Sequence, residues 1–540
     1  MSDTWLAGWR PYLLLGVLCV CLYLPGLAAI PVTDRDEARF AQATRQMLET
    51  GDFLDIRFQD EARNNKPAGI YWLQAAAVGA LSTPQSTAIW PYRLPSVLGA
   101  IVAALLLFGF GRVMLGEPCG AMIAAVLLAT ALGTVAEAHI AKTDAALLAA
   151  VTAGQSVLGL AYLRARAGSH ASLGIAAMFW LAEIAAIYLK GPIGPGLAIL
   201  TAATLSIADR DARWLLSLRP IRGLIVVVFA VAPWLYAIEH ATEGQFLTQS
   251  VGQDFWSKVM GAQEAHGAPP FYYLGLAFLT FWPGSLYLNR AVIGGWRQRA
   301  DPATRYLLAW LVPGWIVLEL IPTKLPHYAL PLYPALALLA GRFLIAGAPL
   351  SSAHRVVDSA LWLLATLALA AALVIAPIKF GGGVMVPGLA AAAALIILAA
   401  IPLFRRLEPI GITALAVALS LAFVVPAAGY IVPRLDGLWL SRAASVLAAA
   451  HPPAAGKTLT VIGYNEPSLV FLLNSGFKTG MGDAPLAAGD EALVGDRLLV
   501  PFAKNLFAHG LRTHGIGWVS GTDYSNGQKM TLTLYQIVRQ

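Results

Sequence analysis

Charged residues are scarce in this chain of 540 residues, where Asp, Glu, Lys and Arg together make up only 12%. Soluble proteins carry charges at roughly a quarter of their positions, so the composition excludes an ordinary water-soluble fold. Cysteine is scarcer still: Cys19, Cys21 and Cys119 lie in or beside long apolar segments and indicate neither a disulfide framework nor a thiolate metal site. The formal net charge of +7 forms no basic stripe, so we expect no nucleic acid partner.

Hydrophobic residues make up 58% of the chain and come in long runs. Runs such as residues 94–110 and 360–377 are about long enough to cross the hydrocarbon core of a bilayer, roughly 30 Å, as a helix. The bilayer offers the backbone no hydrogen-bond partner, which makes helix the expected conformation. We predict about thirteen membrane spans. They lie near residues 11–30, 92–114, 118–136, 144–163, 172–189, 191–207, 222–238, 271–289, 304–321, 327–346, 356–377, 386–403 and 410–432.

Arginine falls in every second connection between the predicted spans, for example at Arg112 and at Arg297. The positive-inside rule assigns such connections to the cytoplasm. The other connections then face outward, and they include two long segments, residues 31–90 and 239–270. The apolar run after Arg10 could be a cleaved signal peptide, but its length and the charged stretch that follows favour an uncleaved first span.

From about residue 436 the composition changes to that of a soluble fold. Short apolar stretches such as 459–462 and 530–538 are separated by Gly, Asn and Asp turns. An odd number of spans places this tail on the outer side. The sequence therefore predicts a polytopic α-helical membrane domain over residues 1–435, followed by a small soluble α/β domain over residues 436–540.

The outward segment after the first span carries Asp36, Glu37 and Arg39. The plain interpretation is a solvated loop whose charges pair locally. The functional interpretation is that one carboxylate is a general base, with arginines that orient it or bind an anion. Apolar residues continue at helical spacing to Met47, which predicts an amphipathic helix at the membrane interface.

Further outward connections contain residues that could bind a lipid headgroup. Lys66 precedes the aromatic residue Tyr71, where lysine is either a snorkelling anchor or a ligand of a lipid phosphate. Asp144 begins a span, where a carboxylate facing lipid would cost on the order of 3 kcal/mol, so it either caps the helix or faces a cavity. The remaining charged residues of these connections include Glu137, His139, Lys142, Lys190, Lys258, His266, Lys324 and His327. Carboxylates and cations beside the lipid suit an acid or base reaction on a lipid phosphate ester.

Several short motifs follow one another between residue 30 and about residue 340. They include Asp36-Glu37-Ala38-Arg39-Phe40-Ala41, Lys66-Pro67, Arg93-Leu94-Pro95, Lys190-Gly191-Pro192 and Thr323-Lys324-Leu325-Pro326-His327-Tyr328. In order and spacing they resemble the polyprenyl-phosphate-sugar glycosyltransferases of the GT-C type, in the protein O-mannosyltransferase-like superfamily. Within that type they resemble the bacterial family that transfers 4-amino-4-deoxy-L-arabinose to lipid A.

The resemblance implies roles for individual residues. Asp36 would be the catalytic aspartate, which accepts the acceptor's proton or orients the nucleophile, and Asp144 would be a second acid. The donor phosphate would be held by Lys66, Arg39, Lys258, Lys324 and Tyr328, and the further site candidates are Glu37, His327 and His266. The family usually has arginine where this chain has Lys258, and often Glu where it has Asn65. No cofactor is implied with certainty, and a divalent metal stays open.

The function implied is that of a multi-pass enzyme of the bacterial inner membrane with its active site facing the periplasm. It would move a sugar from undecaprenyl phosphate to lipid A or a related outer-leaflet glycolipid, in one inverting displacement. The alternative is a related transferase that adds galacturonic acid or a hexose to lipopolysaccharide core, a hopanoid or a surface glycan. A lipid transporter or flippase fits less well, because transporters usually bind near mid-membrane, whereas these charges lie at one interface.

Overall fold

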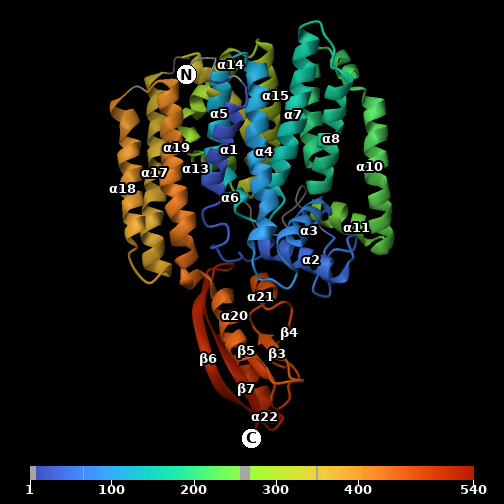
Figure 1. Cartoon of the computed structure of the whole chain (residues 1–540), viewed down its shortest axis with the longest axis vertical. Coiled ribbons are helices and arrows are strands. Elements are labelled where there is room, and N and C mark those ends of the chain that lie inside the picture. Colours follow the sequence, from blue (N-terminus) through green and yellow to red (C-terminus); the bar gives the residue numbers. More distant parts are fainter. Residues whose placement is uncertain (1–5, 7, 65, 256–267, 348–350, 406) are drawn as a thin grey trace.

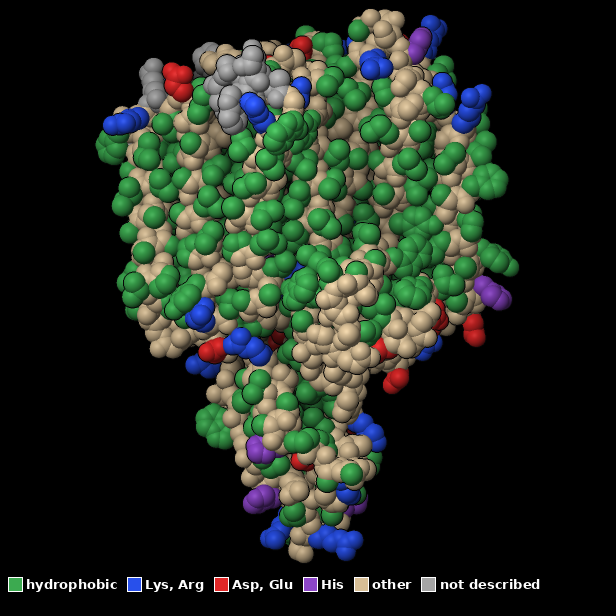
Figure 2. Space-filling view, in the orientation of Figure 1, with side chains coloured by type: hydrophobic (Ala, Val, Ile, Leu, Met, Phe, Trp, Pro, Cys, Tyr) green, Lys and Arg blue, Asp and Glu red, His purple; other side chains and the backbone are tan. Residues whose placement is uncertain are grey.

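The computed structural model describes residues 6, 8–64, 66–255, 268–347, 351–405 and 407–540. A bundle of long helices forms one end of the molecule, and a small sheet with its own helices projects from the other end (Figure 1). Hydrophobic side chains cover the sides of the bundle, and Lys and Arg side chains gather at its upper rim (Figure 2). This distribution is typical of a protein that crosses a bilayer.

Eight described helical segments are long and apolar enough to cross a membrane, or nine when the bent pair α5 and α6 is taken as one span. The eight are α4 (Trp90–Leu115), α7 (Asp144–Arg166), α8 (Leu173–Lys190), α10 (Pro220–Ala241), α15 (Pro302–Leu320), the segment Pro326–Ile345 that includes α16 (Tyr333–Ile345), α17 (Ser352–Phe380) and the segment Pro409–Arg434 that includes α19 (Pro409–Pro426). The bent pair is α5 (Pro118–Thr130) and α6 (Leu132–Ala138), at 55° to each other. The described chain is thus that of a multi-pass membrane protein, as predicted.

Other predicted spans coincide with shorter helices, so the figure of thirteen stays a prediction. These are α1 (Arg10–Tyr23), α9 (Ile193–Asp209) and the apolar segment Val386–Pro402 of α18 (Val386–Phe404). The single helix expected over residues 271–289 is wrong. The structure has α13 (Tyr272–Thr280), a 3-10 turn at Gly284–Tyr287 and then α14 (Leu288–Arg297). Pro283 has no N–H to continue the helical ladder, which explains the interruption.

Two helices lie at the end of the bundle that faces the sheet (Figure 1). The helix α2 (Asp36–Thr50) buries Phe40, Ala43 and Met47, which confirms the amphipathic helix expected from the spacing of apolar residues. It ends at Gly51, whose φ of 72° suits the left-handed cap of a helix. A small hairpin of β1 (Arg57–Phe58) and β2 (Glu61–Ala62) connects α2 to α3 (Gly69–Leu81). The short α11 (Gln245–Leu247) follows α10 at the same end of the bundle.

The C-terminal part contains a five-stranded sheet with strand order β4-β3-β5-β7-β6. β3 pairs in parallel with β4 and β5, and β7 pairs antiparallel with β5 and β6. The strands are β3 (Leu459–Ile462), β4 (Phe477–Gly480), β5 (Glu491–Gly495), β6 (Leu511–Asp523) and β7 (Gln528–Arg539), and the helices are α20 (Leu440–Ala450), α21 (Pro467–Leu472) and α22 (Leu499–Ala508). This mixed sheet confirms the predicted fold class, while the domain boundary at residue 436 stays a prediction.

Candidate functional site

A buried ion pair fixes the start of α2 to the bundle. The Nε atom of Arg93, on α4, lies 2.8 Å from Oε1 of Glu37, and both side chains are fully buried. Glu37 also accepts hydrogen bonds from the N–H groups of Thr33 and Ala141, at 2.8 and 2.9 Å. Burial alone would raise the pKa of Glu37, but Arg93 and these donors outweigh it, so its pKa lies below the usual value. The geometry therefore assigns Glu37, a predicted site candidate, an anchoring role.

Asp36 is the first residue of α2, and its side chain is exposed. Within the described parts of the chain, its carboxylate makes no hydrogen bond or ion pair. Its charge nevertheless acts on Lys142. Burial lowers the pKa of the Lys142 ammonium, but Glu137, Asp144 and, to a smaller extent, Asp36 raise it above its usual value. Asp36 therefore faces a group of charged side chains that the fold gathers nearby.

This group, here called the charged cluster, consists of Glu137, Lys142, Asp144, Lys190 and His327. The Nζ atom of Lys190 lies 2.5 Å from Oδ1 of Asp144, and that of Lys142 lies 3.1 Å from Oε1 of Glu137 and 3.7 Å from Oδ2 of Asp144. The His327 ring lies between the carboxylates, with nitrogens 3.8 Å from Glu137 and from Asp144. Two carboxylates, two ammonium groups and an imidazole thus meet in one small region.

The charged cluster is built from segments far apart in the sequence. Asp144 begins α7, Lys190 ends α8, and His327 lies in the 3-10 segment Pro326–Leu332. Lys190 also lies over the ring of Tyr328, 5.2 Å from its centroid. All members are buried or nearly so, with Lys190 the most exposed, at 15% of its side chain. The predicted residues Asp144, His327 and Tyr328 are therefore brought together.

Other predicted residues lie elsewhere. Arg39 and Lys66 are half-buried on and after α2. The ammonium of Lys324 donates to the backbone carbonyls of Glu319 and Ile321, at 2.8 and 3.0 Å, and so caps the end of α15. That geometry gives no support to Lys324 as a phosphate ligand. Lys258 and His266 lie outside the described residues.

Sequence reasoning noted Lys142, Lys190 and Glu137 only as charges in outward connections and gave them no role. Their position at the ends of apolar spans was the available signal, since an ionisable group there needs a partner or a ligand. Nothing in the sequence showed that three separate connections converge. Among the described residues, no group of three or more His, Cys, Asp or Glu side chains is arranged to hold a metal ion.

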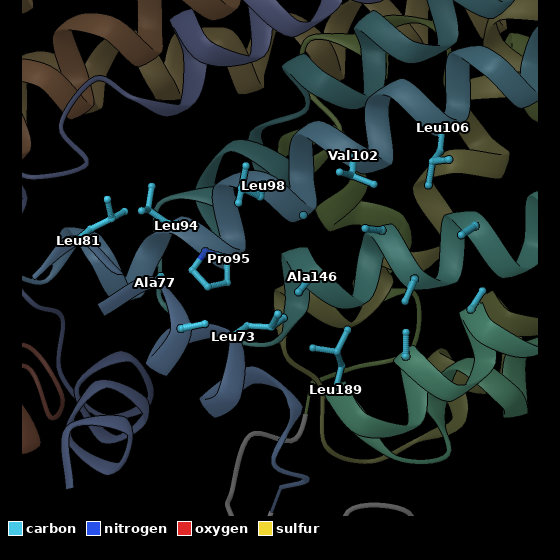
Figure 3. A pocket seen from close by; sticks show the side chains of 17 residues that line it. Leu73, Ala77, Leu81, Leu94, Pro95, Leu98, Val102, Leu106, Ala146 and Leu189 are labelled. Carbon is cyan, nitrogen blue, oxygen red and sulfur yellow. The ribbon is translucent and has the colours of Figure 1, made fainter. Parts of the chain in front are cut away.

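An apolar groove of about 590 Å³ lies between α3, α4, α7 and α8, and two of its lining residues are close in sequence to members of the charged cluster. Figure 3 shows leucine side chains of α3 and α4, such as Leu73 and Leu98, facing Ala146 of α7 and Leu189 of α8. Ala146 stands two residues after Asp144, and Leu189 immediately precedes Lys190. The arrangement suits an amphiphile whose apolar chain lies in the groove and whose anionic head meets the lysines.

Known proteins that resemble this chain are glycosyltransferases that use polyprenyl-phosphate-linked sugars. The family model of dolichyl-phosphate-mannose-protein mannosyltransferase matches residues 10–238. The undecaprenyl phosphate-alpha-4-amino-4-deoxy-L-arabinose arabinosyl transferase of Pectobacterium carotovorum subsp. carotovorum is 26% identical over 382 residues, which are 69% of this chain and 65% of that protein. A Pseudomonas fluorescens arabinosyl transferase is 28% identical over 338 residues, 62% of this chain and 60% of that protein.

The crystal structure of ArnT from Cupriavidus metallidurans bound to undecaprenyl phosphate superimposes with a TM-score of 0.74, at 18% identity, and covers 98% of both chains. The chain is similar in sequence to bacterial aminoarabinose transferases and has the fold of one of them. This confirms the resemblance seen in the sequence motifs. The matched region spans about two thirds or less of the curated relatives, at 65% and 60% of their lengths. The fold match, by contrast, includes the C-terminal sheet.

Proposed function

We propose that this protein transfers 4-amino-4-deoxy-L-arabinose from undecaprenyl phosphate to lipid A or a related glycolipid at the periplasmic face of the bacterial inner membrane. The observation that carries the proposal is the apolar groove lined by Ala146 and Leu189, on the two helices that also carry Asp144 and Lys190 of the charged cluster. The relatives are named for this donor and sugar, and the Cupriavidus structure holds undecaprenyl phosphate. A related transferase for another sugar or acceptor is the alternative.

The donor has a long apolar chain and one phosphate, which are the two features that the site accommodates. The groove buries isoprenoid surface between α3, α4, α7 and α8. Each lysine ammonium has three N–H donors, so Lys142 and Lys190 keep donors for a phosphate oxygen beyond their bonds to the carboxylates. Lys66, Arg39 and Tyr328 are proposed to complete the phosphate site from the rim.

The proposed reaction is one displacement at the anomeric carbon. A bond forms between this carbon and an oxygen of the acceptor while the bond to the donor phosphate breaks, and the electron pair leaves on undecaprenyl phosphate. The leaving phosphate gains negative charge, which the neighbouring ammonium groups stabilise. Attack opposite the leaving group inverts the configuration.

Asp36 is proposed to accept the acceptor's proton or to orient the attacking oxygen. Asp36 stands in the first turn of α2, at the end of the helix that carries partial positive charge. Its exposed side chain can reach an incoming acceptor, whereas Glu37 cannot, since it is held by Arg93. Asp144 is proposed to hold Lys190 and His327 in place during this step.

The experiment that tests the proposal incubates the purified full chain, in detergent without any gradient, with a panel of undecaprenyl-phosphate sugars and lipid acceptors. Mass spectrometry of the lipids identifies the products. The expected result is an aminoarabinose-sized mass increase on lipid A. Transfer of a different sugar, or to a different acceptor, would establish the alternative transferase. The absence of transfer with every pair, including the aminoarabinose donor with lipid A, would contradict the proposed activity.

Replacing Lys190 by Met is expected to raise the KM for the donor about 10- to 100-fold, because a charge-assisted hydrogen bond to phosphate is lost. Lys379→Met serves as the control, since this exposed lysine lies on α17 and its ammonium lies 5.1 Å from the centroid of the Phe380 ring, its one contact among the described residues. Initial rates at varied donor concentration measure the effect. An unchanged donor KM in Lys190→Met would remove Lys190 from the proposed phosphate site.

A further inference from the structure

The C-terminal sheet domain contacts the segment that carries Asp36. The backbone N–H of Asp34 donates a hydrogen bond to the Tyr524 hydroxyl oxygen, at 2.6 Å. The Arg35 guanidinium donates to the Ser525 carbonyl oxygen, at 2.9 Å. Tyr524 and Ser525 belong to the turn between β6 and β7, so this turn touches both residues that precede Asp36.

The contact continues from this turn onto α21. The backbone N–H of Ser468 donates to Oδ1 of Asp34, at 3.3 Å. Farther along α2, Arg45 donates to the Phe471 carbonyl oxygen at 2.5 Å and lies over the Phe471 ring, 4.0 Å from its centroid. Gln42 donates to the Ser475 hydroxyl at 2.8 Å. Arg45, Gln42 and Phe471 are buried, so the domain is packed against α2.

The backbone that these contacts hold is in an uncommon conformation. Arg35 has φ of 62° and ψ of −106°, in the region that favours glycine over residues with a side chain. Such a conformation persists only where the surroundings over-determine it. Among the described residues, the side chain of Arg35 makes no capping hydrogen bond to the first turn of α2. The β6–β7 turn restrains Asp34 and Arg35 from outside the helix, because its Tyr524 hydroxyl and Ser525 carbonyl oxygens accept their hydrogen bonds.

The β6–β7 turn is itself held by hydrogen bonds. The Ser525 hydroxyl donates to Oε2 of Glu466, at 2.9 Å, and its N–H donates to Oδ1 of Asp523, at 3.1 Å. Burial, with the charges of Asp34 and Asp523, raises the pKa of Glu466 to about 7. A turn fixed in this way can act as a rigid support for the backbone it contacts.

We propose that the C-terminal domain positions Asp36 for the reaction, through the bonds of Tyr524 and Ser525 to Asp34 and Arg35. On the other side of Asp36, Glu37 is fixed to the bundle by Arg93. The carboxylate of Asp36 thus stands between two anchored neighbours and needs no bond of its own to face the charged cluster. The inference rests on the proposed function, in which Asp36 takes part in transfer. Tyr524 is a positioning residue, because it acts through the backbone before Asp36.

The test compares Tyr524→Phe with Tyr535→Phe in the purified full chain. Tyr535 lies on β7 in the same domain, and within the described residues its hydroxyl makes no hydrogen bond. Tyr524→Phe is expected to lower kcat about 10-fold with an unchanged donor KM, because a displaced catalytic group costs rate and not donor binding. Tyr535→Phe is expected to keep both values. Equal kcat in the two variants would overturn the inference.

A double-variant cycle separates positioning from general damage to the fold. In an Asp36→Asn background, Tyr524→Phe is expected to lower the residual rate no further, since the residue that it positions is already disabled. A full additional 10-fold loss would show that Tyr524 acts by another route and would overturn the inference. If Asp36→Asn alone keeps the unaltered rate, the role of Asp36 in the proposed function fails instead, which distinguishes the two failures.

A second variant keeps the test decisive if Tyr524→Phe does not fold. Arg35→Gly removes the guanidinium that donates to the Ser525 carbonyl oxygen. Glycine adopts the φ of 62° at this position readily, so the substitution adds no backbone strain. It is expected to show the same loss of kcat with an unchanged thermal unfolding midpoint. An Arg35→Gly protein with the unaltered kcat would contradict positioning by the C-terminal domain.

Discussion

Replacing Arg93 by Met is expected to lower the free energy of unfolding by about 3–5 kcal/mol, because it leaves the buried carboxylate of Glu37 without its partner. Arg93 also donates to the backbone carbonyls of Leu27, Ile30 and Pro31, at 2.8, 2.8 and 2.9 Å. Those acceptors lose their donor in the same substitution. Thermal unfolding of the purified protein in detergent measures the change.

Arg112→Met is the matched control, since Arg112 lies on the same helix and, in the part of the chain that the structure describes, makes only a ring contact with Phe108, at 5.6 Å. Its loss is expected to cost less than about 1 kcal/mol. The double variant Arg93→Met with Glu37→Leu is expected to regain part of the stability, because the unpaired charge is gone. Equal stability of the Arg93 and Arg112 variants would show that the pair does not hold the start of α2.

Replacing Asp36 by Asn is expected to lower kcat about 10³-fold, which is the usual contribution of a general base. The donor KM is expected to stay nearly unchanged, since the role proposed for Asp36 concerns the acceptor and Asp36 does not line the groove. Transfer from the undecaprenyl-phosphate sugar that proves active, followed by mass spectrometry of the lipid product, measures the effect.

Asp60→Asn is the control for this substitution, because Asp60 is an exposed carboxylate in the same outward segment. It is expected to leave kcat within about 2-fold, since surface substitutions away from a site usually have small effects. An Asp36→Asn enzyme with the rate of the Asp60 control would contradict a role as base. The charged cluster at Asp144 would then have to supply the proton acceptor.

The sequence predicted which residues belong to the candidate site better than it predicted their contacts. Asp36 stands in a motif that resembles a known family, and Asp144 stands at the head of the fourth predicted span, so both could be identified without coordinates. Glu37 stands in the same motif as Asp36, yet the structure gives it a buried anchoring contact with Arg93. The two acids are adjacent on α2 and therefore point in different directions. The sequence alone does not show which of the two points into the bundle. Arg93, which stands 56 residues away in the sequence, binds Glu37 and so decides which of the two acids is buried.

The contacts of Lys190 and Lys324 were not predictable from the sequence either. Both lie in outward connections close to a proline, and only Lys324 was predicted to hold phosphate. The structure places Lys190 against Asp144 and turns Lys324 onto the carbonyls at the end of α15. A lysine side chain is long and flexible, so whether it meets a ligand or a helix end depends on the surrounding packing.

The sequence by itself determined the membrane class, the positions of most helices and the presence of a separate soluble tail. These features follow from local hydrophobicity, because a bilayer selects for long apolar runs and a soluble sheet for short ones. Only the tertiary structure decided that Glu137, Lys142, Asp144, Lys190 and His327 form one cluster. The same holds for the apolar groove between α3, α4, α7 and α8 and for the contact of Tyr524 with the backbone before Asp36. Those contacts join residues up to 490 positions apart, and such pairings depend on how all the helices pack together, which no local pattern encodes.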